Sequence, residues 1–365
     1  MKAYGPPGGA LAVVKDHRLV YARGYGWADR EQKLAATPES LFRIASLSKP
    51  VTAVAVLKLA EQKKLDLDGR VFDLLGLDVH LPQSATLDGR WRRITVRQLL
   101  HHTGGWDRAK HGGDPMFIAK EWLAKKFPEF PVGSPWPIIR HQLAQPLDFD
   151  PETRYAYSNF GYCLLGRVIE KVTGQPYETF VLQTVLAPAH IKRMRLGRRV
   201  ERADGEVRYY SKNDEGAPSA INLEATDASG GWIASVVDLG RFAAALDNSQ
   251  HSPLLKPASF AAMYAPPSPP VSRKDDGSLE DVYYGCGWSV RPVGKSGKAN
   301  YWHYGDMPGS NTFLVRRTSG ISMAVLFNLR PEPKALADTD FDSVLRQAAE
   351  NVTDWPTEDL FNRYS

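Results

Sequence analysis

The feature that most constrains this chain is an almost continuous apolar run from Pro50 to Leu57, which reads Pro-Val-Thr-Ala-Val-Ala-Val-Leu. It belongs to a longer segment, residues 46–64, that we expect to form a helix. The start of this helix is apolar nearly all round, and such a helix is buried within a fold rather than lying on its surface. Polar residues gather only toward its end, between Lys58 and Lys64. The sequence therefore predicts a helix in a central, buried position.

A hydroxyl and an amine stand at the start of this helix, at Ser46 and Lys49. Residues three apart share one helix face, and the free N–H groups and dipole of a first turn favour an oxyanion. Serine needs a neighbouring base to act as a nucleophile, and Lys49 can be that base where burial or another cation lowers its pKa. Ser46 could equally be a helix cap, and roughly one Ser-x-x-Lys match is expected by chance in a chain of this length. The motif needs companions to carry a function.

Two companion motifs follow in a consistent order, Tyr157-x-Asn159 and His303-x-Gly305. Ser-x-x-Lys, then Tyr-x-Asn, then Lys- or His-x-Gly is the motif set of the active-site-serine penicillin-recognising enzymes. The chain resembles this family of serine β-lactamases and penicillin-binding proteins. The resemblance is to the branch that holds class C β-lactamases, D-Ala-D-Ala carboxypeptidases, D-aminopeptidases and class VIII esterases.

The resemblance extends over nearly the whole chain. Residues 24–29 look like the second strand of the family, residues 99–105 resemble its Leu-Leu-x-His-Thr-Ser-Gly segment, and residues 230–242 match a further stretch. The fold that this implies is α/β (α+β) and β-lactamase/transpeptidase-like.

The hydrophobic pattern predicts how such a fold is assembled. Strand-like segments lie near both ends of the chain, at residues 10–14, 19–27, 283–291, 298–304, 311–317 and 321–328. The middle is mainly helical, and segments 95–102 and 160–173 are its clearest helices. We expect one antiparallel sheet, completed by both chain ends and flanked by helices, with an inserted helical subdomain and the site in the cleft. Residues 1–365 would be one domain, with a sheet part of 1–75 and 206–365 and a helical part of 76–205.

The resemblance implies roles for the residues of the first two motifs. Ser46 would be the nucleophile, and its proton would pass to a pair formed by Lys49 and Tyr157. Which of the two is the base stays open, because coupled groups titrate together. Asn159 would orient the lysine or the substrate amide. Tyr157 could instead be a core tyrosine in an aromatic cluster, and Asn159 a helix cap.

The third motif would supply the far wall of the site. By resemblance, His303 and Gly305 belong to that wall, and the N–H groups of Ser46 and Asp306 would hold the oxyanion. His303 could instead be a packed histidine between aromatic neighbours. Lys295-Ser296-Gly297 also fits the third motif, but it reads as a hairpin turn, so we favour His303.

Substrate preference is less defined than the chemistry. Class C β-lactamases normally begin the third motif with a lysine that receives a carboxylate, and His303 replaces it here. A carboxylate at Asp306 would disfavour anionic substrates if its side chain faced the cleft. We therefore expect a hydrolase of small esters or amides. The alternatives are a D-Ala-D-Ala carboxypeptidase or weak β-lactamase, and a penicillin-type sensor that acylates once without turnover.

Composition excludes several other functions. A net charge of +5 without a long basic block gives no reason to expect nucleic-acid binding, and no apolar run approaches a membrane span of roughly 20 residues. The adjacent pair His101 and His102 points to different helix faces, and no Cys/His cluster suggests zinc, so we expect neither metal nor cofactor. Cys163 and Cys286 are read as separate thiols. Oligomeric state stays open.

The N-terminus leads almost directly into a strand and has no apolar signal region. Family members commonly carry a helix before that strand, and many carry a secretory signal. We expect an upstream segment to be missing. The location stays open between the periplasm or exterior, if a signal has been lost, and the cytoplasm.

Overall fold

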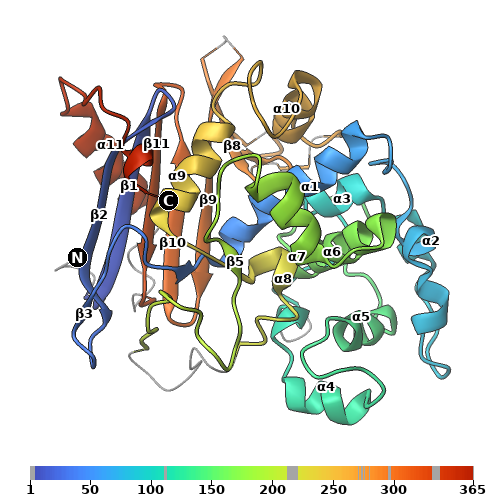
Figure 1. The fold of residues 1–365 in the computed structure, drawn as a ribbon. Coiled ribbons are helices and arrows are strands. Elements are labelled where there is room, and N and C mark those ends of the chain that lie inside the picture. Colours follow the sequence, from blue (N-terminus) through green and yellow to red (C-terminus); the bar gives the residue numbers. More distant parts are fainter. Residues whose placement is uncertain are drawn as a thin grey trace.

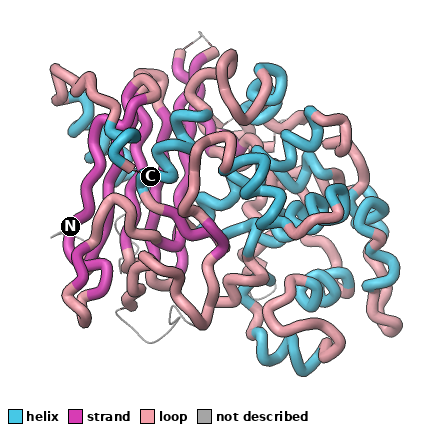
Figure 2. Tube along the Cα trace, viewed as in Figure 1, coloured by secondary structure: helices cyan, strands magenta, loops and turns pink. Residues whose placement is uncertain are grey.

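A large sheet stands beside a mainly helical layer in the computed structural model of the protein (Figure 1; Figure 2). The structure describes residues 5–110, 113–211, 221–269, 271–272, 274, 276–278, 280–294, 297–330 and 338–364. The alternative third motif at Lys295 and Ser296 lies outside these residues. The mixed α/β architecture confirms the fold class predicted from the sequence.

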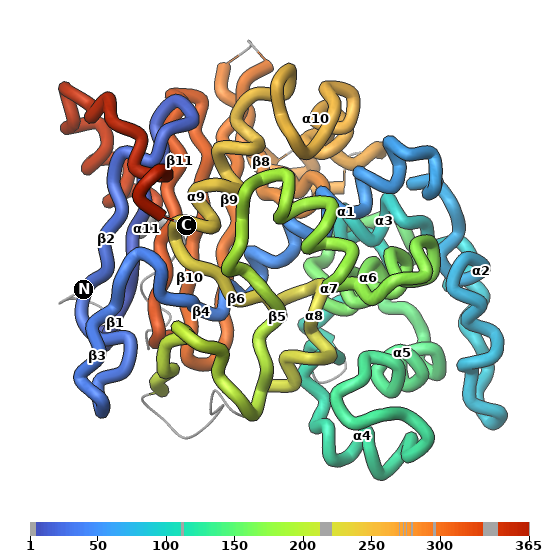
Figure 3. Tube along the Cα trace, viewed as in Figure 1, coloured from blue at the N-terminus to red at the C-terminus, as the bar shows by residue number. Residues whose placement is uncertain are grey.

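The large sheet has eight antiparallel strands in the order β3-β2-β1-β11-β10-β9-β8-β7. The strands are β1 (Gly8–Lys15), β2 (Arg18–Asp29), β3 (Leu34–Ala35), β7 (Tyr283–Tyr284), β8 (Ser289–Val293), β9 (Lys298–Met307), β10 (Ser310–Arg316) and β11 (Ile321–Phe327). The N-terminal strand β1 pairs with β11, with Ala12 opposite Ala324. The two ends of the chain therefore complete one sheet, as predicted, and the blue and orange strands lie side by side in Figure 3.

Both faces of this sheet are covered, as the alternate residues of β1 show by packing into two different hydrophobic clusters. Ala10, Ala12 and Val14 belong to the large core that the sheet shares with the helices, whereas Val13 belongs to a second cluster with Phe313 of β10. This is the two-residue period of a strand buried on both sides. Helix α9 (Val236–Ala245) packs on β1 and β11, and α11 (Asp338–Glu350) closes the second cluster with Ala349.

Helix α1 (Ser48–Glu61) runs through the middle of the helical layer. The other helices are α2 (Val71–Leu75), α3 (Val96–Leu100), α4 (Lys120–Lys126), α5 (Trp136–Leu143), α6 (Asn159–Thr173), α7 (Tyr177–Val181), α8 (Asp227–Gly230) and α10 (Pro257–Tyr264). Every residue of α1 from Ser48 to Leu57 is buried, which confirms the predicted central helix. Among the helices that the structure describes, none combines the length and apolar character needed to cross a membrane.

The structure differs from the expected helix at its start. The α-helix begins at Ser48 rather than at residue 46, and Ser46 lies in a preceding 3₁₀ turn, η1 (Ala45–Leu47). Ala45, which precedes Ser46, has a left-handed φ of 48° that does not fit a regular helix, so no helix extends upstream of the serine. The α-helix also ends at Glu61, and Lys63 takes the left-handed conformation with φ of 55°.

A second, three-stranded sheet was missed from the sequence. It consists of β4 (Phe42–Arg43), β6 (Trp232–Ala234) and β5 (Arg195–Leu196), in the order β4-β6-β5. Strands of two or three residues are too short to show an alternating pattern. Strand β4 of this small sheet leads directly into η1, the turn that carries Ser46.

Central burial of α1 gives a test of the fold. Leu57 of α1 is 1% exposed, whereas Leu34 of the edge strand β3 is 53% exposed. We expect Leu57→Ala to lower the free energy of unfolding by about 2–5 kcal/mol, through lost burial and a residual cavity. The matched control Leu34→Ala should change it by about 0.5 kcal/mol or less. Urea denaturation measures both, and equal effects would contradict the central position of α1.

Candidate active site

Ser46 stands on a tight strand-to-helix turn between the two parts of the fold. Strand β4 ends at Arg43, Ala45 turns the backbone left-handed at φ 48°, and η1 carries the serine. Ala45 and Leu47 are buried, whereas Ser46 between them is half-buried. A left-handed alanine costs roughly 1–2 kcal/mol and persists only where its surroundings hold it. The turn therefore presents one hydroxyl at the surface of an otherwise closed region.

Strands β9 and β10 hold this turn in place. The Ser310 hydroxyl donates to the Arg43 carbonyl at 2.5 Å, and the Thr312 hydroxyl donates to the Ile44 carbonyl at 3.0 Å. Gly305 on β9 lies so close that a Cβ there would be 2.0 Å from the Thr312 hydroxyl oxygen and 2.3 Å from the Ile44 oxygen. The glycine of His-x-Gly is therefore required by backbone contact between the sheet and the serine turn.

Lys49 contacts three groups around its buried amine. Its Nζ lies 3.1 Å from Ser46 Oγ, 2.6 Å from Asn159 Oδ1 and 2.7 Å from the Ser229 carbonyl oxygen. The amide and carbonyl oxygens can only accept hydrogen bonds. A neutral amine has two N–H groups and one lone pair. Two donations to these oxygens therefore leave the lone pair of a neutral Lys49 for the Ser46 hydroxyl.

The surroundings of Lys49 favour that neutral form. Desolvation by burial holds the pKa of Lys49 well below its ordinary value, an effect that the Asp114 carboxylate opposes and the Arg108 guanidinium reinforces. Its Nζ also lies 4.8 Å from the centre of the Tyr157 ring. Burial thus provides the pKa shift that the sequence argument required of a lysine base.

Asp114 fixes the amide of Asn159 and was missed from the sequence. Its Oδ2 accepts from Asn159 Nδ2 at 2.7 Å, and a carboxylate can accept but not donate. The amide oxygen of Asn159 must therefore point to Lys49. Asp114 also caps the short 3₁₀ helix Pro115–Phe117 by accepting from the Met116 N–H. An Asp before a Pro is an ordinary cap signal, so nothing in the sequence distinguished this carboxylate.

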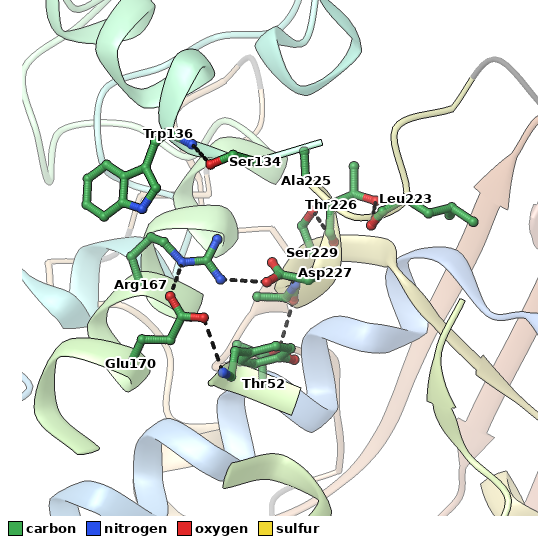
Figure 4. Close-up of polar contacts among 12 residues, drawn as sticks. Thr52, Ser134, Trp136, Arg167, Glu170, Leu223, Ala225, Thr226, Asp227 and Ser229 are labelled. Atoms are coloured by element: carbon green, nitrogen blue, oxygen red, sulfur yellow. Dashed lines mark hydrogen bonds and ion pairs between the residues drawn. The ribbon is translucent and has the colours of Figure 1, made fainter. Parts of the chain in front are cut away.

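The carbonyl of Ser229 is held by a buried network around α8 (Figure 4). Asp227 at the start of α8 accepts from Arg167 of α6 at 2.5 Å, and Arg167 also donates to Glu170 at 2.7 Å. Thr52 of α1 donates to the Ala228 carbonyl at 2.7 Å. Because α8 is only one turn long, these side chains rather than its own length fix the direction of its carbonyl groups.

Tyr157 faces Ser46 from the loop before α6. Burial strongly raises the pKa of Tyr157, and a hydrogen bond with the Ser46 side chain partly opposes that rise. The phenol therefore stays protonated at neutral pH. Ser158 caps α6 by accepting from the Gly161 N–H at 3.1 Å, and its own N–H donates to His102 Nδ1 at 3.2 Å. The position of Tyr157 is thus set by the contacts of the adjacent residue Ser158 rather than by those of its own side chain.

His303 is a neutral wall residue in this geometry. Its Nδ1 must donate to the Tyr304 carbonyl at 2.6 Å, so Nε2 accepts from the Tyr284 hydroxyl at 2.8 Å. Desolvation by burial and the nearby Lys49 lower the pKa of His303 from 6.5 to about 3. Its ring lies 6.3 Å from that of Tyr157. The Tyr304 carbonyl therefore sets the tautomer of the wall histidine, and Tyr284, a residue not predicted from the sequence, donates to its other ring nitrogen.

Asp306 directs its N–H to an edge of β9 and its side chain to one face of the sheet. Met307 and Ser310 close the β9–β10 hairpin, so Asp306 directs its N–H to the edge of β9 that faces away from β10. Its side chain lies on the face opposite to Gly305, because successive residues alternate, and its carboxylate forms an ion pair with Arg330 at 3.0 Å. The condition under which Asp306 would repel anionic substrates is therefore not met.

The paired histidines have partners within the core. His101 Nδ1 donates to the Tyr284 carbonyl at 3.1 Å, and His102 accepts from the Ser158 N–H. Burial lowers the pKa of both rings. No group of His, Cys, Asp and Glu side chains that could hold a metal ion occurs in the described part of the chain. Cys163 and Cys286 are free and buried.

Comparison with known proteins gives one family over most of the chain. The family model described as Beta-lactamase matches residues 1–347. Penicillin-binding protein 4* of Bacillus subtilis is 26% identical over 362 residues, which cover 94% of this chain and 72% of that protein. The octameric penicillin-binding protein homologue from Pyrococcus abyssi superimposes with a TM-score of 0.73 at 25% identity, covering 95% of this chain and 75% of that one. The D-stereospecific amidohydrolase from Streptomyces sp. gives a TM-score of 0.69 at 26% identity, with coverages of 90% and 91%.

The buried lysine gives a prediction that is independent of activity. The folded pKa of Lys49 lies well below its unfolded value of 10.5. Between these two pH values the unfolded chain binds one proton more than the folded protein. The free energy of unfolding therefore rises with pH in this range, and it falls as the pH is lowered toward the folded pKa of Lys49. Between about pH 8 and pH 10 it should rise more steeply in the wild type than in Lys49→Met, by up to about 1.4 kcal/mol per pH unit.

Urea denaturation at several pH values measures this difference in slope. Hydrogen bonds lost in Lys49→Met shift its whole curve but leave the slope difference intact. Lys63→Met removes an exposed lysine and is the matched control for loss of one positive charge. Parallel curves for the wild type and Lys49→Met would show that the amine is charged in the folded protein.

Proposed function

The chain belongs to the beta-lactamase family, and we propose that it is a serine hydrolase that cleaves small esters or amides through an acyl-enzyme on Ser46. The observation that carries this proposal is the arrangement around the Lys49 amine. Two of its partners can only accept hydrogen bonds, and burial favours the neutral amine, so the remaining lone pair of Lys49 is directed to the Ser46 hydroxyl. The relatives named above, two penicillin-binding proteins and an amidohydrolase, support the same class of chemistry.

Acylation follows from the contacts of the serine. Ser46 Oγ attacks the substrate carbonyl carbon as its proton passes to Lys49 Nζ. The oxyanion lies against the N–H of Ser46 and, on the exposed edge of β9, the N–H of Asp306. Each such donor in a preorganised site contributes about 3–4 kcal/mol of transition-state stabilisation. Gly305 lets β9 approach the serine turn directly, and we propose that both donors reach one oxygen.

Tyr157 is proposed as the acid for the leaving group. Its phenol is protonated at neutral pH and already contacts Ser46, so it can give its proton to the departing alkoxide or amine. The Lys49–Tyr157 pair then has taken one proton from Ser46 and given one to the leaving group. Water releases the acyl group by the reverse sequence, in which the pair takes a proton from water and returns one to Ser46 Oγ.

The relatives define the alternatives for the substrate. A D-Ala-D-Ala carboxypeptidase is the second candidate, because two of the relatives are named penicillin-binding proteins. Release of free D-alanine from a D-Ala-D-Ala peptide would favour it over the esterase. A single-turnover sensor is the third candidate, and it would acylate once and stop.

The nucleophile is tested with 4-nitrophenyl butyrate. We expect a release phase near one equivalent of nitrophenol followed by steady turnover, both lost in Ser46→Ala, because the variant lacks the hydroxyl on which the acyl-enzyme is proposed to form. Mass spectrometry of the quenched reaction should find the butyryl group on Ser46. Wild-type rates in Ser46→Ala would remove the assignment, and a release phase without later turnover would identify the sensor.

The role of the tyrosine is tested by a neighbouring pair. Tyr157→Phe removes the phenol that contacts Ser46, so kcat should fall about 10²–10⁴-fold, as for loss of a general acid. Tyr155→Phe removes a hydroxyl from the same aromatic cluster and should change kcat by less than about threefold. Stopped-flow and steady-state rates of nitrophenol release give both values. Equal losses in the two variants would mean that the cluster, rather than Tyr157, carries the effect.

A further inference from the structure

We infer that Arg108 is a specificity-determining residue of this site, and that it receives an anionic group, such as a carboxylate, on the substrate. The inference rests on the proposed function, because it names a substrate class for the same site. It opposes the expectation of neutral substrates drawn from His303 and Asp306.

Arg108 lies directly against the proposed acid, on the exposed side of Tyr157, which is here called the rim of the site. Its guanidinium carbon is 4.8 Å from the centre of the Tyr157 ring. The side chain is exposed, whereas Tyr157 beneath it is half-buried. A planar guanidinium that stacks on an aromatic face keeps its N–H groups directed sideways. The ring therefore holds the cation beside the tyrosine that contacts Ser46.

The donors of Arg108 are uncommitted among the residues that the structure describes. No ion pair or hydrogen bond joins Arg108 to a carboxylate or carbonyl there. Its neighbours show the ordinary alternative: Arg154 pairs with Asp107 at 2.9 Å, and Arg330 pairs with Asp306 at 3.0 Å. Arg108 is the described cation at this rim that combines a fixed position with a free fork of N–H groups.

Among the described residues, the far wall and the serine turn offer no other cation to a substrate. Burial keeps His303 neutral, and its two ring nitrogens are bonded to Tyr304 and Tyr284. The amine of Lys49 is enclosed by Ser46, Asn159 and Ser229. A carboxylate on the substrate would therefore meet Arg108, whose fork matches its two oxygens. The inference covers a carboxylate on the acyl half and a carboxylate on the leaving half of the substrate.

Matched esters separate these two halves. We would compare 4-nitrophenyl hexanoate with its anionic counterpart mono-4-nitrophenyl adipate, which carries the charge on the acyl half. The hexanoate ester of 5-hydroxy-2-nitrobenzoate carries it on the leaving half. The measured quantity is the ratio of kcat/KM for the anionic ester to that for the neutral ester, which cancels general losses of activity.

We expect Arg108→Gln to lower this ratio about tenfold for one of the anionic esters, as for loss of one charge-assisted pair at a partly exposed site. Arg108→Lys, which keeps the charge but not the planar fork, should give an intermediate ratio. The matched control Arg154→Gln removes the same charge from a nearby arginine that is already paired, and should change the ratio by less than about twofold. An unchanged ratio in Arg108→Gln, or an equal fall in Arg154→Gln, would overturn the inference.

A binding measurement keeps this test separate from the proposed function. Calorimetry with adipic acid monoamide and hexanamide, on Ser46→Ala with and without Arg108→Gln, needs no turnover. If Ser46→Ala binds the anionic amide selectively and this selectivity disappears with Arg108→Gln, the inference is supported. Failure of the wild type to hydrolyse any of the esters would contradict only the proposed hydrolase function. Equal binding of the two amides in Ser46→Ala, together with an unchanged leaving-half ester ratio in Arg108→Gln, would overturn the inference while leaving an observed esterase activity intact.

Discussion

The burial of one lysine amine is the constraint on which the rest of this structure depends. Desolvation makes the charged form of Lys49 expensive, and the groups around it must satisfy a neutral amine instead. Those groups come from distant parts of the chain. Asn159 begins α6, Ser229 lies in α8, and Ser46 precedes α1. Assembly of the helical layer and formation of a base are therefore the same event.

Each contact of the amine has its own support. Asp114 sets the orientation of the Asn159 amide, and the ion pair between Arg167 and Asp227 anchors the short helix that carries Ser229. From the other side, Gly305 and Thr312 bring the sheet against the serine turn. The strain of a left-handed Ala45 is distributed over these contacts. The site is thus rigid because both parts of the fold meet at it.

The three motifs and the central helix could be predicted from sequence because they are local patterns. The pairing of both chain ends in one sheet followed from strand-like segments at the two ends of the chain. The residues that the sequence did not reveal act through tertiary contacts. Asp114 reads as a helix cap, Tyr284 as a strand tyrosine and Ser229 contributes only its backbone. Arg108 is one of many arginines, and only its position over the Tyr157 ring distinguishes it.

The absence of a side chain at Gly305 has a consequence for how such a protein can diverge. The Ile44 carbonyl and the Thr312 hydroxyl occupy the space beside Gly305, so no side chain at this position fits between the sheet and the serine turn. Substitutions of side chains cannot adjust this contact gradually, so descendants that keep the site must keep the contact almost unchanged. The rim loop that carries Arg108 has no such restriction. A lineage built on this fold can therefore change what it recognises while its chemistry stays fixed.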